Sequence, residues 1–111
     1  MNVAQKEIVL VEYPFSDLRG SKLRPALIIS NEKFNNFSDD CLAVPLTTVL
    51  KHAPYSVHID QSDLNSGELF RPSRIRIDKI FSVEKNLIIK KLGVLSTASF
   101  EKVKTMFLSI I

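Results

Sequence analysis

The sequence has no tryptophan and only one cysteine, two histidines and three glycines among its 111 residues. One cysteine cannot form an internal disulfide, and with two histidines beside it no zinc-site spacing is present. With 24% charged residues, only three glycines and five prolines, the composition suggests neither a disordered nor a low-complexity chain. We therefore expect Cys41 to be a small core residue, and we expect no metal and no cofactor.

Long apolar runs are also absent. None reaches the roughly 18 residues of a membrane span, and Gln5, Lys6 and Glu7 stand where a signal peptide would be apolar. We therefore expect a cytoplasmic protein without membrane contact. With 45% hydrophobic residues the chain is long enough for one core and too short for two ordinary domains. A single domain over residues 1–111 is the expectation.

Positive charge is unevenly distributed along the chain. The net charge is only +3, yet residues 71–91 hold seven basic side chains against the two acids Asp78 and Glu84. Lys22 and Arg24 can join this segment in the folded protein. Such a surface favours a polyanion, and the alternative is an ordinary solvated face.

Residues 22–30 place two cations just ahead of an apolar run. Pro25 has no N–H for a ladder and biases Arg24 toward an extended backbone, which suits the first residue of a strand. Ala26 to Ile29 form a short apolar run that predicts a strand buried on both faces. A guanidinium held where a strand meets a loop is well placed to bind an anion, so Arg24 is a candidate site residue, with an exposed loop arginine as the alternative.

Turn residues and hydrophobic patterns predict the other elements. Glu7–Tyr13 and Pro25–Ser30 are expected to pair as a long-looped hairpin, with a second loop over residues 31–40 pinned to the core by Phe34 and Phe37. Residues 61–67 are expected to form a turn. Further strands are expected over Cys41–Leu46, Tyr55–Asp60, Ser73–Asp78 and Leu87–Val94.

The alternation within these strands predicts which side chains face the core. Pro45 suggests an edge or a bulge near the end of its strand, and the pattern predicts a bend near Lys79. The residues expected to point inward are Tyr55, Val57, Ile59, Ile75 and Ile77; those expected to point outward are His58, Arg74, Arg76 and Asp78.

A helix is expected at the chain end. Ser96 can cap it, and its apolar positions Phe100, Val103, Phe107 and Ile110 follow helical spacing. Short strands, long hairpins and one terminal helix predict a mainly β (α+β) fold, a small, partly open antiparallel barrel with a C-terminal helix.

Four stretches together resemble the MazF/PemK family of type II toxin–antitoxin endoribonucleases: Glu7–Val11, Pro14–Leu18, Lys22–Ser30 and Val44–Thr48. The most specific part is Arg-Pro followed by four apolar residues, with Pro-x-Thr about 20 positions later. The resemblance implies an SH3-like barrel that forms a homodimer. It also implies cleavage of single-stranded RNA without a metal, and neutralisation by a cognate antitoxin.

The resemblance also assigns site residues. It implies catalysis by Arg24 and Thr47, and the RNA-binding residues expected with them are Ser21, Lys22, Thr48, Arg71, Arg74 and Arg76. The chain departs from the family at three positions. Lys6 replaces the glycine that usually precedes the first strand, Glu7 replaces the aspartate beside it, and Ser73 stands where some members carry an acid.

Metal-free RNA cleavage uses the 2′-hydroxyl of the substrate as nucleophile, so the protein assists deprotonation and stabilises the charged phosphorane. A forked guanidinium such as that of Arg24 suits the second task, although it is a poor base. Thr47 can orient a phosphate oxygen. His52 is a candidate base and His58 a weaker one. Loops 17–23 and 49–55 are expected to read unpaired bases.

Two other functions are compatible with the sequence. A nucleic-acid-binding barrel without catalysis requires only the basic strand from Arg71 to Arg76. A toxin that targets gyrase would resemble proteins that share this barrel and act through an aromatic C-terminal end. This chain ends in Leu-Ser-Ile-Ile and has no tryptophan, which disfavours the gyrase-directed function.

Overall fold

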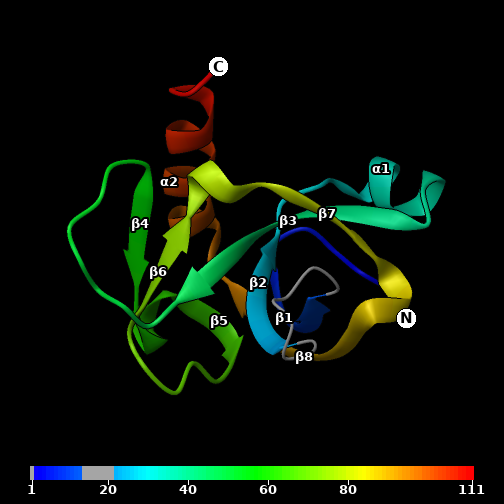
Figure 1. The fold of residues 1–111 in the computed structure, drawn as a ribbon, viewed down its shortest axis with the longest axis horizontal. Helices are drawn as coiled ribbons and strands as arrows, with labels where there is room; N and C mark the ends of the chain where they lie inside the picture. Colours follow the sequence, from blue (N-terminus) through cyan, green and yellow to red (C-terminus); the bar gives the residue numbers. More distant parts are fainter. Residues whose placement is uncertain (1, 14–21) are drawn as a thin grey trace.

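The computed structural model describes residues 2–13 and 22–111. Its strands and helices follow one another along the chain as drawn in Figure 1. The strands are β1 (Glu7–Tyr13), β2 (Lys22–Ile28), β3 (Asp40–Thr47), β4 (Ser56–Ile59), β5 (Leu64–Gly67), β6 (Ser73–Arg76), β7 (Phe81–Glu84) and β8 (Ile88–Leu95). The helices are α1 (Glu32–Phe37) and α2 (Thr97–Leu108), with short 3-10 turns over Gln61–Asp63, Ile77–Lys79 and Lys85–Leu87.

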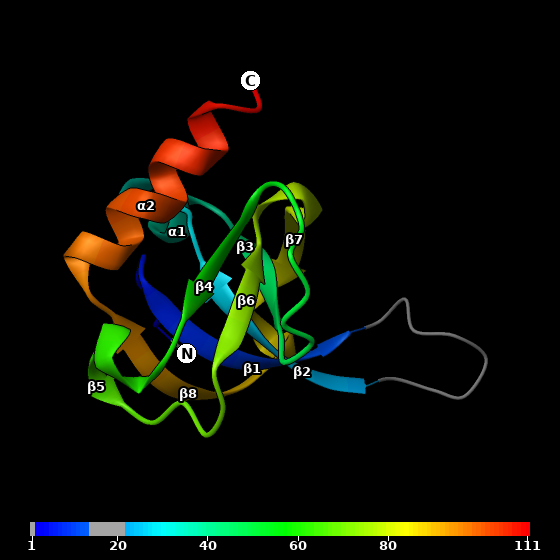
Figure 2. The same cartoon turned by 90° about the vertical axis from the view of Figure 1, so that its left-hand side faces the viewer.

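The strands form one curled antiparallel sheet in the order β4-β6-β3-β2-β1-β8-β5, and β7 pairs with β3 outside this order. Strand β3 is the central member, because its start pairs with β7, its middle with β2 and its end with β6. Figure 2 shows the strands curling beneath α2. The expected fold class, a mainly β, partly open antiparallel barrel with a C-terminal helix, is confirmed.

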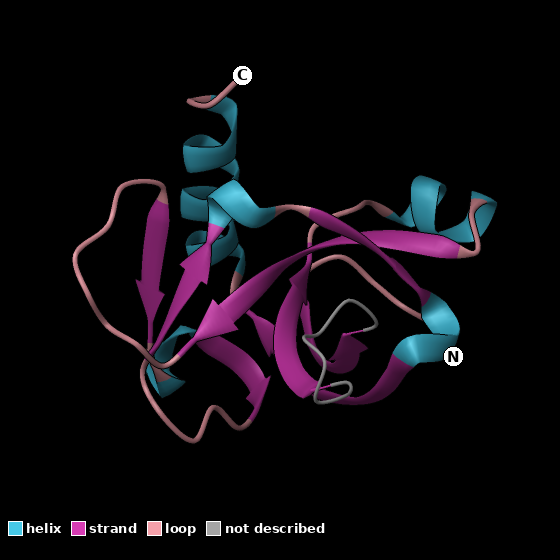
Figure 3. Cartoon of the chain, in the orientation of Figure 1, coloured by secondary structure: helices cyan, strands magenta, loops and turns pink. Residues whose placement is uncertain are grey.

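Two hydrophobic clusters fill the two faces of the curled sheet. Strand β2 contributes Leu27 to the first, and Ala26 and Ile28 to the second, so its apolar run is buried on both faces as expected. Helix α2 covers the first cluster with Phe100 and Val103, and Figure 3 shows it standing against the β4–β6 end. This leaves the other face of the β4–β6–β3 region available for polar groups.

The start of β2 differs from the expectation. The strand begins at Lys22, and Pro25 is paired with Leu10 in its middle, so Pro25 is not the first strand residue. The β2–β3 ladder begins only at Ala26, opposite Pro45. At Pro25 the strand therefore has β1 as its only paired neighbour among the described residues, and a missing N–H is tolerated at such a position.

Residues 31–40 were expected to form a loop pinned by two phenylalanines, and this is wrong. Asn31 caps helix α1 by accepting a hydrogen bond from the Phe34 backbone N–H. Phe34 is exposed and Phe37 is 89% exposed, while Asn35 is buried and hydrogen-bonds to Ser30. A polar network therefore holds this segment, because Asn35 satisfies buried hydrogen-bonding groups that an aromatic ring cannot.

Several other expectations are decided by the structure. The strands Cys41–Leu46 and Leu87–Val94 are confirmed within one residue, Cys41 is buried, and a 3-10 turn makes the bend near Lys79. Within the expected turn at 61–67, residues 64–67 form β5, which pairs with β8. Tyr55 is 43% exposed and precedes β4, so its inward placement is wrong.

Helix α2 begins after Ser96, whose Oγ accepts a hydrogen bond from the Ser99 N–H, as expected of a cap. It ends at Leu108, so Ile110 lies beyond the helix and is 42% exposed. Neither helix in residues 2–13 and 22–111 combines the length and apolar character that a membrane crossing demands.

Lys6 has a backbone φ of 79°, in the left-handed region that favours glycine. Its N–H donates to the Ile28 carbonyl, and its carbonyl accepts from the Leu95 N–H. These two bonds tie the start of β1 to β2 and to the end of β8. Glycine would adopt this left-handed backbone without strain, and this chain has lysine there instead.

Candidate functional site

A polar face lies on the β4–β6–β3 region, opposite α2. In the ladders Thr47 and His58 are both paired with Arg74, and Ser56 is paired with Arg76. Directly paired residues share one face of a sheet, and so do residues two apart on a strand. We define the polar face by Thr47, Ser56, His58, Arg74 and Arg76. The intervening residues Leu46, Val57, Ile59 and Ile75 point into the first hydrophobic cluster.

Arg24 and Thr47 lie at corresponding places on neighbouring strands. The β2–β3 ladder ends at the pair Ala26–Pro45, and each of the two site residues is two positions beyond that pair. Because side chains alternate, both follow the same face as Ala26 and Pro45. Beyond this point β3 continues alongside β6, as Figure 1 shows. Arg24 is exposed and Thr47 half-buried, so both are available at the place where the two strands separate.

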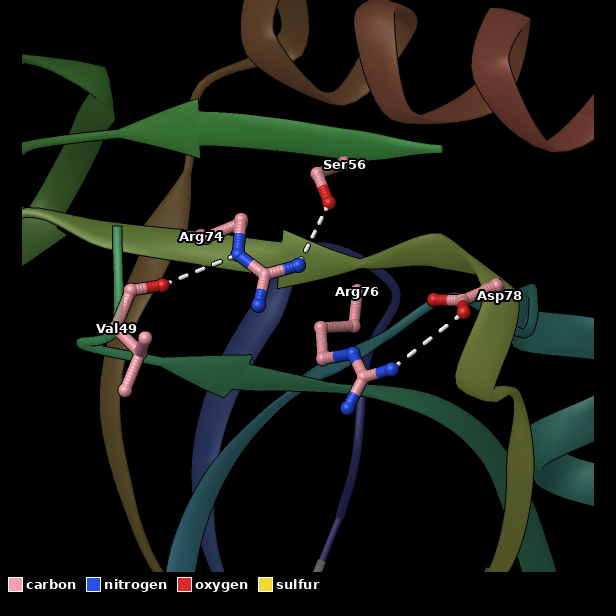
Figure 4. Close-up of polar contacts among 5 residues, drawn as sticks. All are labelled: Val49, Ser56, Arg74, Arg76 and Asp78. Carbon is pink, nitrogen blue, oxygen red and sulfur yellow. Dashed lines mark hydrogen bonds and ion pairs between the residues drawn. The ribbon is translucent and has the colours of Figure 1, made fainter. Parts of the chain in front are cut away.

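Arg74 was expected to point outward, and it does follow the polar face, but it is not open to solvent. It is only 4% exposed. Its Nε donates to the Val49 carbonyl at 3.1 Å and its Nη1 to the Ser56 Oγ at 2.9 Å (Figure 4). The segment between β3 and β4 contributes the carbonyl, and the first residue of β4 contributes the hydroxyl. Alternation along β6 cannot reveal that these groups enclose the guanidinium.

Arg76 and Asp78 form an ion pair beside Arg74. Arg76 Nη2 lies 3.5 Å from Asp78 Oδ2, and the two side chains are 36% and 42% exposed (Figure 4). Arg76 Nε is buried and has no hydrogen-bond partner among the described residues. An unpaired buried donor of this kind costs stability, because it has lost its hydrogen bonds to water.

The hydroxyl of Thr47 accepts a hydrogen bond from the Val49 N–H at 3.2 Å. This bond uses an acceptor site of the oxygen and leaves its O–H free to donate. Thr48, next along the chain, is exposed. The end of β3 therefore presents a hydroxyl donor on the polar face.

The remaining expected residues are spread more widely. Arg71 is exposed ahead of β6, and His52 and His58 are exposed. Ser73 is buried, and its Oγ donates to the Arg71 carbonyl at 3.0 Å, so it has a structural hydrogen bond. Ser21, residues 17–21 of the expected base-reading loop and the side chain of Lys22 lie outside the described part of the chain.

Asp78 is a candidate site residue that the sequence did not assign to the site. It was expected only to point outward, in phase with Arg76. The signal was therefore present, because residues two apart on an extended segment share a face. The 3-10 turn that begins at Ile77 then keeps the carboxylate close to the guanidinium.

Within residues 2–13 and 22–111, no three His, Cys, Asp or Glu side chains gather as metal ligands would. The site is instead composed of guanidinium groups, hydroxyls and one carboxylate. Such groups can bind a phosphodiester, polarise it and accept a proton from a neighbouring hydroxyl.

Comparison with known proteins identifies the relatives of this chain. The family described as PemK-like, MazF-like toxins of type II toxin–antitoxin systems matches residues 4–111. No curated protein matches the sequence. An endoribonuclease from a mycobacterial species is 25% identical, with a TM-score of 0.75 over 98% of this chain and 90% of that one.

Two further structures share the fold. A mycobacterial endoribonuclease in complex with its cognate antitoxin is 23% identical, with a TM-score of 0.77 over 96% of this chain and 92% of that one. A MazE–MazF complex from Deinococcus radiodurans is 18% identical, with a TM-score of 0.79 over 99% of this chain and 96% of that one.

Proposed function

The chain belongs to the family of PemK-like, MazF-like toxins of type II toxin–antitoxin systems, and on this premise we propose that it is an endoribonuclease that cleaves single-stranded RNA. The observation that carries the proposal is that Thr47 and Arg76 share the polar face and that Asp78 is ion-paired to Arg76, with Arg24 on the neighbouring strand. An endoribonuclease with the same fold and 25% identity supports it.

The proposed reaction uses the 2′-hydroxyl of the substrate as nucleophile. The 2′-oxygen loses its proton and attacks the adjacent phosphorus, the bond from phosphorus to the 5′-oxygen breaks, and that oxygen takes a proton from solvent. The products are a 2′,3′-cyclic phosphate and a 5′-hydroxyl end. No metal is needed in this scheme, because the nucleophile belongs to the RNA and protein cations stabilise the charge.

Each site residue has a role in this step. The guanidinium groups of Arg24 and Arg76 bind the phosphate oxygens, where negative charge develops in the transition state. Thr47 donates its hydroxyl to one of these oxygens and orients the phosphate for in-line attack. Asp78 is positioned by Arg76 to accept the proton of the 2′-hydroxyl, and it replaces the exposed His52 as our candidate base.

The toxin family implies an antitoxin, and one structure with this fold is that of an endoribonuclease bound to its antitoxin. We propose that a cognate antitoxin neutralises this protein by laying an acidic segment over the polar face, in competition with RNA. The homodimer and the cytoplasmic location remain predictions from the resemblance and from the sequence.

The decisive experiment incubates the purified protein with a long mixed-sequence transcript in EDTA. We expect discrete fragments whose 3′ ends carry a cyclic phosphate, and mapping their ends gives the preferred cleavage sequence. Intact RNA that shifts in a gel would instead identify a binding protein without catalysis. Cleavage that requires added metal would contradict the proposed chemistry while preserving the ribonuclease assignment.

A further inference from the structure

The segment between β3 and β4, residues 48–55, is held near both ends. Arg74 donates one hydrogen bond to the Val49 carbonyl and another to the hydroxyl of Ser56, the first residue of β4. One buried guanidinium thus connects the two ends of the segment. We call residues 48–55 the connecting segment, and its end next to Ser56 is fixed relative to the polar face.

Tyr55, the last residue of the connecting segment, has an unfavourable backbone. Its φ is 58°, in the left-handed region that side chains larger than glycine rarely adopt. Its carbonyl accepts a hydrogen bond from the Ile77 N–H at 3.0 Å, and Arg74 binds the next residue. Two contacts therefore hold a large side chain in a conformation that a glycine would adopt without strain.

The ring of Tyr55 contributes little to the core. It is 43% exposed and is a member of neither hydrophobic cluster. Its backbone is bonded to Ile77, which stands between the two members of the Arg76–Asp78 ion pair. The structure therefore holds an exposed aromatic residue at an energetic cost, with its backbone bonded to the segment that carries Arg76 and Asp78.

We propose that Tyr55 is a specificity-determining residue, whose ring stacks on an unpaired base of the RNA next to the cleaved phosphodiester; this rests on the proposed ribonuclease function. Aromatic rings beside cations are the usual platform for unpaired bases, because each base offers a flat face while the cations hold its phosphate. Fixing the ring in advance lowers the entropy lost when the base binds. The strain at Tyr55 then maintains a preformed stacking surface.

Three substitutions separate the ring from the backbone. Tyr55→Phe keeps the ring and should retain the wild-type KM and cleavage pattern. Tyr55→Ala removes the ring and should raise the KM for single-stranded RNA by about tenfold. Tyr55→Gly removes the ring and also relieves the strain, so it should raise the KM equally while being more stable than Tyr55→Ala in thermal unfolding.

Phe37→Ala is the matched control, because it removes another exposed ring, on α1, which lies at the opposite end of the molecule from β4 (Figure 3). We expect it to leave KM unchanged. The proposal is overturned if Tyr55→Ala cleaves with the wild-type KM and the same cut sites. It is equally overturned if Tyr55→Gly restores the KM that Tyr55→Ala loses, since the backbone and not the ring would then matter.

Binding can be tested independently of cleavage. The chain has two tyrosines and no tryptophan, so a Tyr13→Phe variant leaves Tyr55 as its only tyrosine. A 2′-O-methyl oligonucleotide of mixed sequence cannot supply the nucleophile. It should quench the Tyr55 emission saturably, and a duplex of the same sequence should not. Unchanged emission at saturation would refute stacking, whereas quenching by a protein that cuts no RNA would refute only the ribonuclease function.

Discussion

Arg74 lies directly opposite Thr47 in the β3–β6 ladder, and its guanidinium donates to the carbonyl of Val49, two residues beyond Thr47. The Val49 N–H in turn donates to the Thr47 hydroxyl. The buried arginine therefore fixes the residue that orients Thr47, without needing to touch RNA itself. The site therefore has two kinds of arginine. Arg74 holds the backbone that orients Thr47, whereas Arg24 and Arg76 are proposed to bind the RNA phosphate.

The first prediction compares two neighbouring arginines. Arg74→Lys cannot span both of its acceptors, so we expect a lower kcat and a loss of about 2 kcal/mol in the free energy of unfolding, with an unchanged salt dependence of binding. Arg76→Ala should instead reduce the slope of log K against log salt by about one. Binding titrations at several salt concentrations measure the salt dependence of RNA binding in both variants. A reduced slope in Arg74→Lys would mean that Arg74 itself contacts phosphate.

The second prediction concerns Arg24. Because it is exposed at the edge of the core, Arg24→Ala should fold normally while cleavage falls by about 10²–10³-fold. Single-turnover cleavage and circular dichroism measure the two effects. Lys33→Ala, which removes an exposed cation from α1, is the control and should cleave normally. An Arg24→Ala variant with wild-type activity would remove Arg24 from the mechanism.

The third prediction tests the proposed base. Asp78→Asn keeps the size of the side chain but cannot accept the proton of the 2′-hydroxyl, so kcat should fall by about 10²–10⁴-fold. Binding of a 2′-O-methyl oligonucleotide should persist, because neutralising an acid on a cationic face does not weaken its attraction for RNA. The exposed Asp39, which precedes the first residue of β3, supplies the control Asp39→Asn. Should the two variants cleave equally fast, another group is the base.

The fourth prediction uses the strained backbone at Lys6. Lys6→Gly removes the cost of a left-handed conformation and should stabilise the protein by about 1 kcal/mol. Lys6→Ala loses the same side-chain hydrogen bond to Thr97 but keeps the strain, so it should give no such gain. Thermal or urea unfolding distinguishes them. Equal stability of the two variants would show that strain at this position is negligible.

The fifth prediction concerns Cys41 and pH. Burial raises the pKa of its thiol from 9.0 to about 11, against an opposing effect of Lys85. The native thiol should therefore react slowly with a disulfide reagent at pH 8 and rapidly after unfolding in guanidinium chloride. Since the folded pKa is the higher one, the stabilising contribution is complete below about pH 9 and is lost as the pH rises toward 11.

Cys41→Ala isolates that contribution. The difference in unfolding free energy between the wild type and this variant should shrink between pH 8 and pH 10.5. A difference that stays constant over this range, or fast labelling of the folded wild type at pH 8, would contradict a buried neutral thiol.

The sequence predicts those features of the site that depend on residues close together in the chain, and it misses those that depend on residues far apart in the chain. The motif around Arg24 and Thr47 predicted two site residues, and each lies two positions beyond the last pair of the β2–β3 ladder; their roles stay predictions. The ion pair between Arg76 and Asp78 could have been predicted from the sequence, because both side chains were already expected on one face. The burial of Arg74 was not, since it depends on contacts with residues 18 and 25 positions away.

The amino-acid sequence by itself determined the mainly β fold, the buried apolar run of β2, the cap of α2 and the two residues of the family motif, because alternation, capping and short motifs are local properties. Only the tertiary structure decided that Asn35 rather than the phenylalanines holds α1, that Arg74 is enclosed, and that Tyr55 has a strained backbone bonded to Ile77. The reason is physical: period-two patterns report which face of a strand a side chain follows, but whether that face is open is decided by a distant segment folding across it.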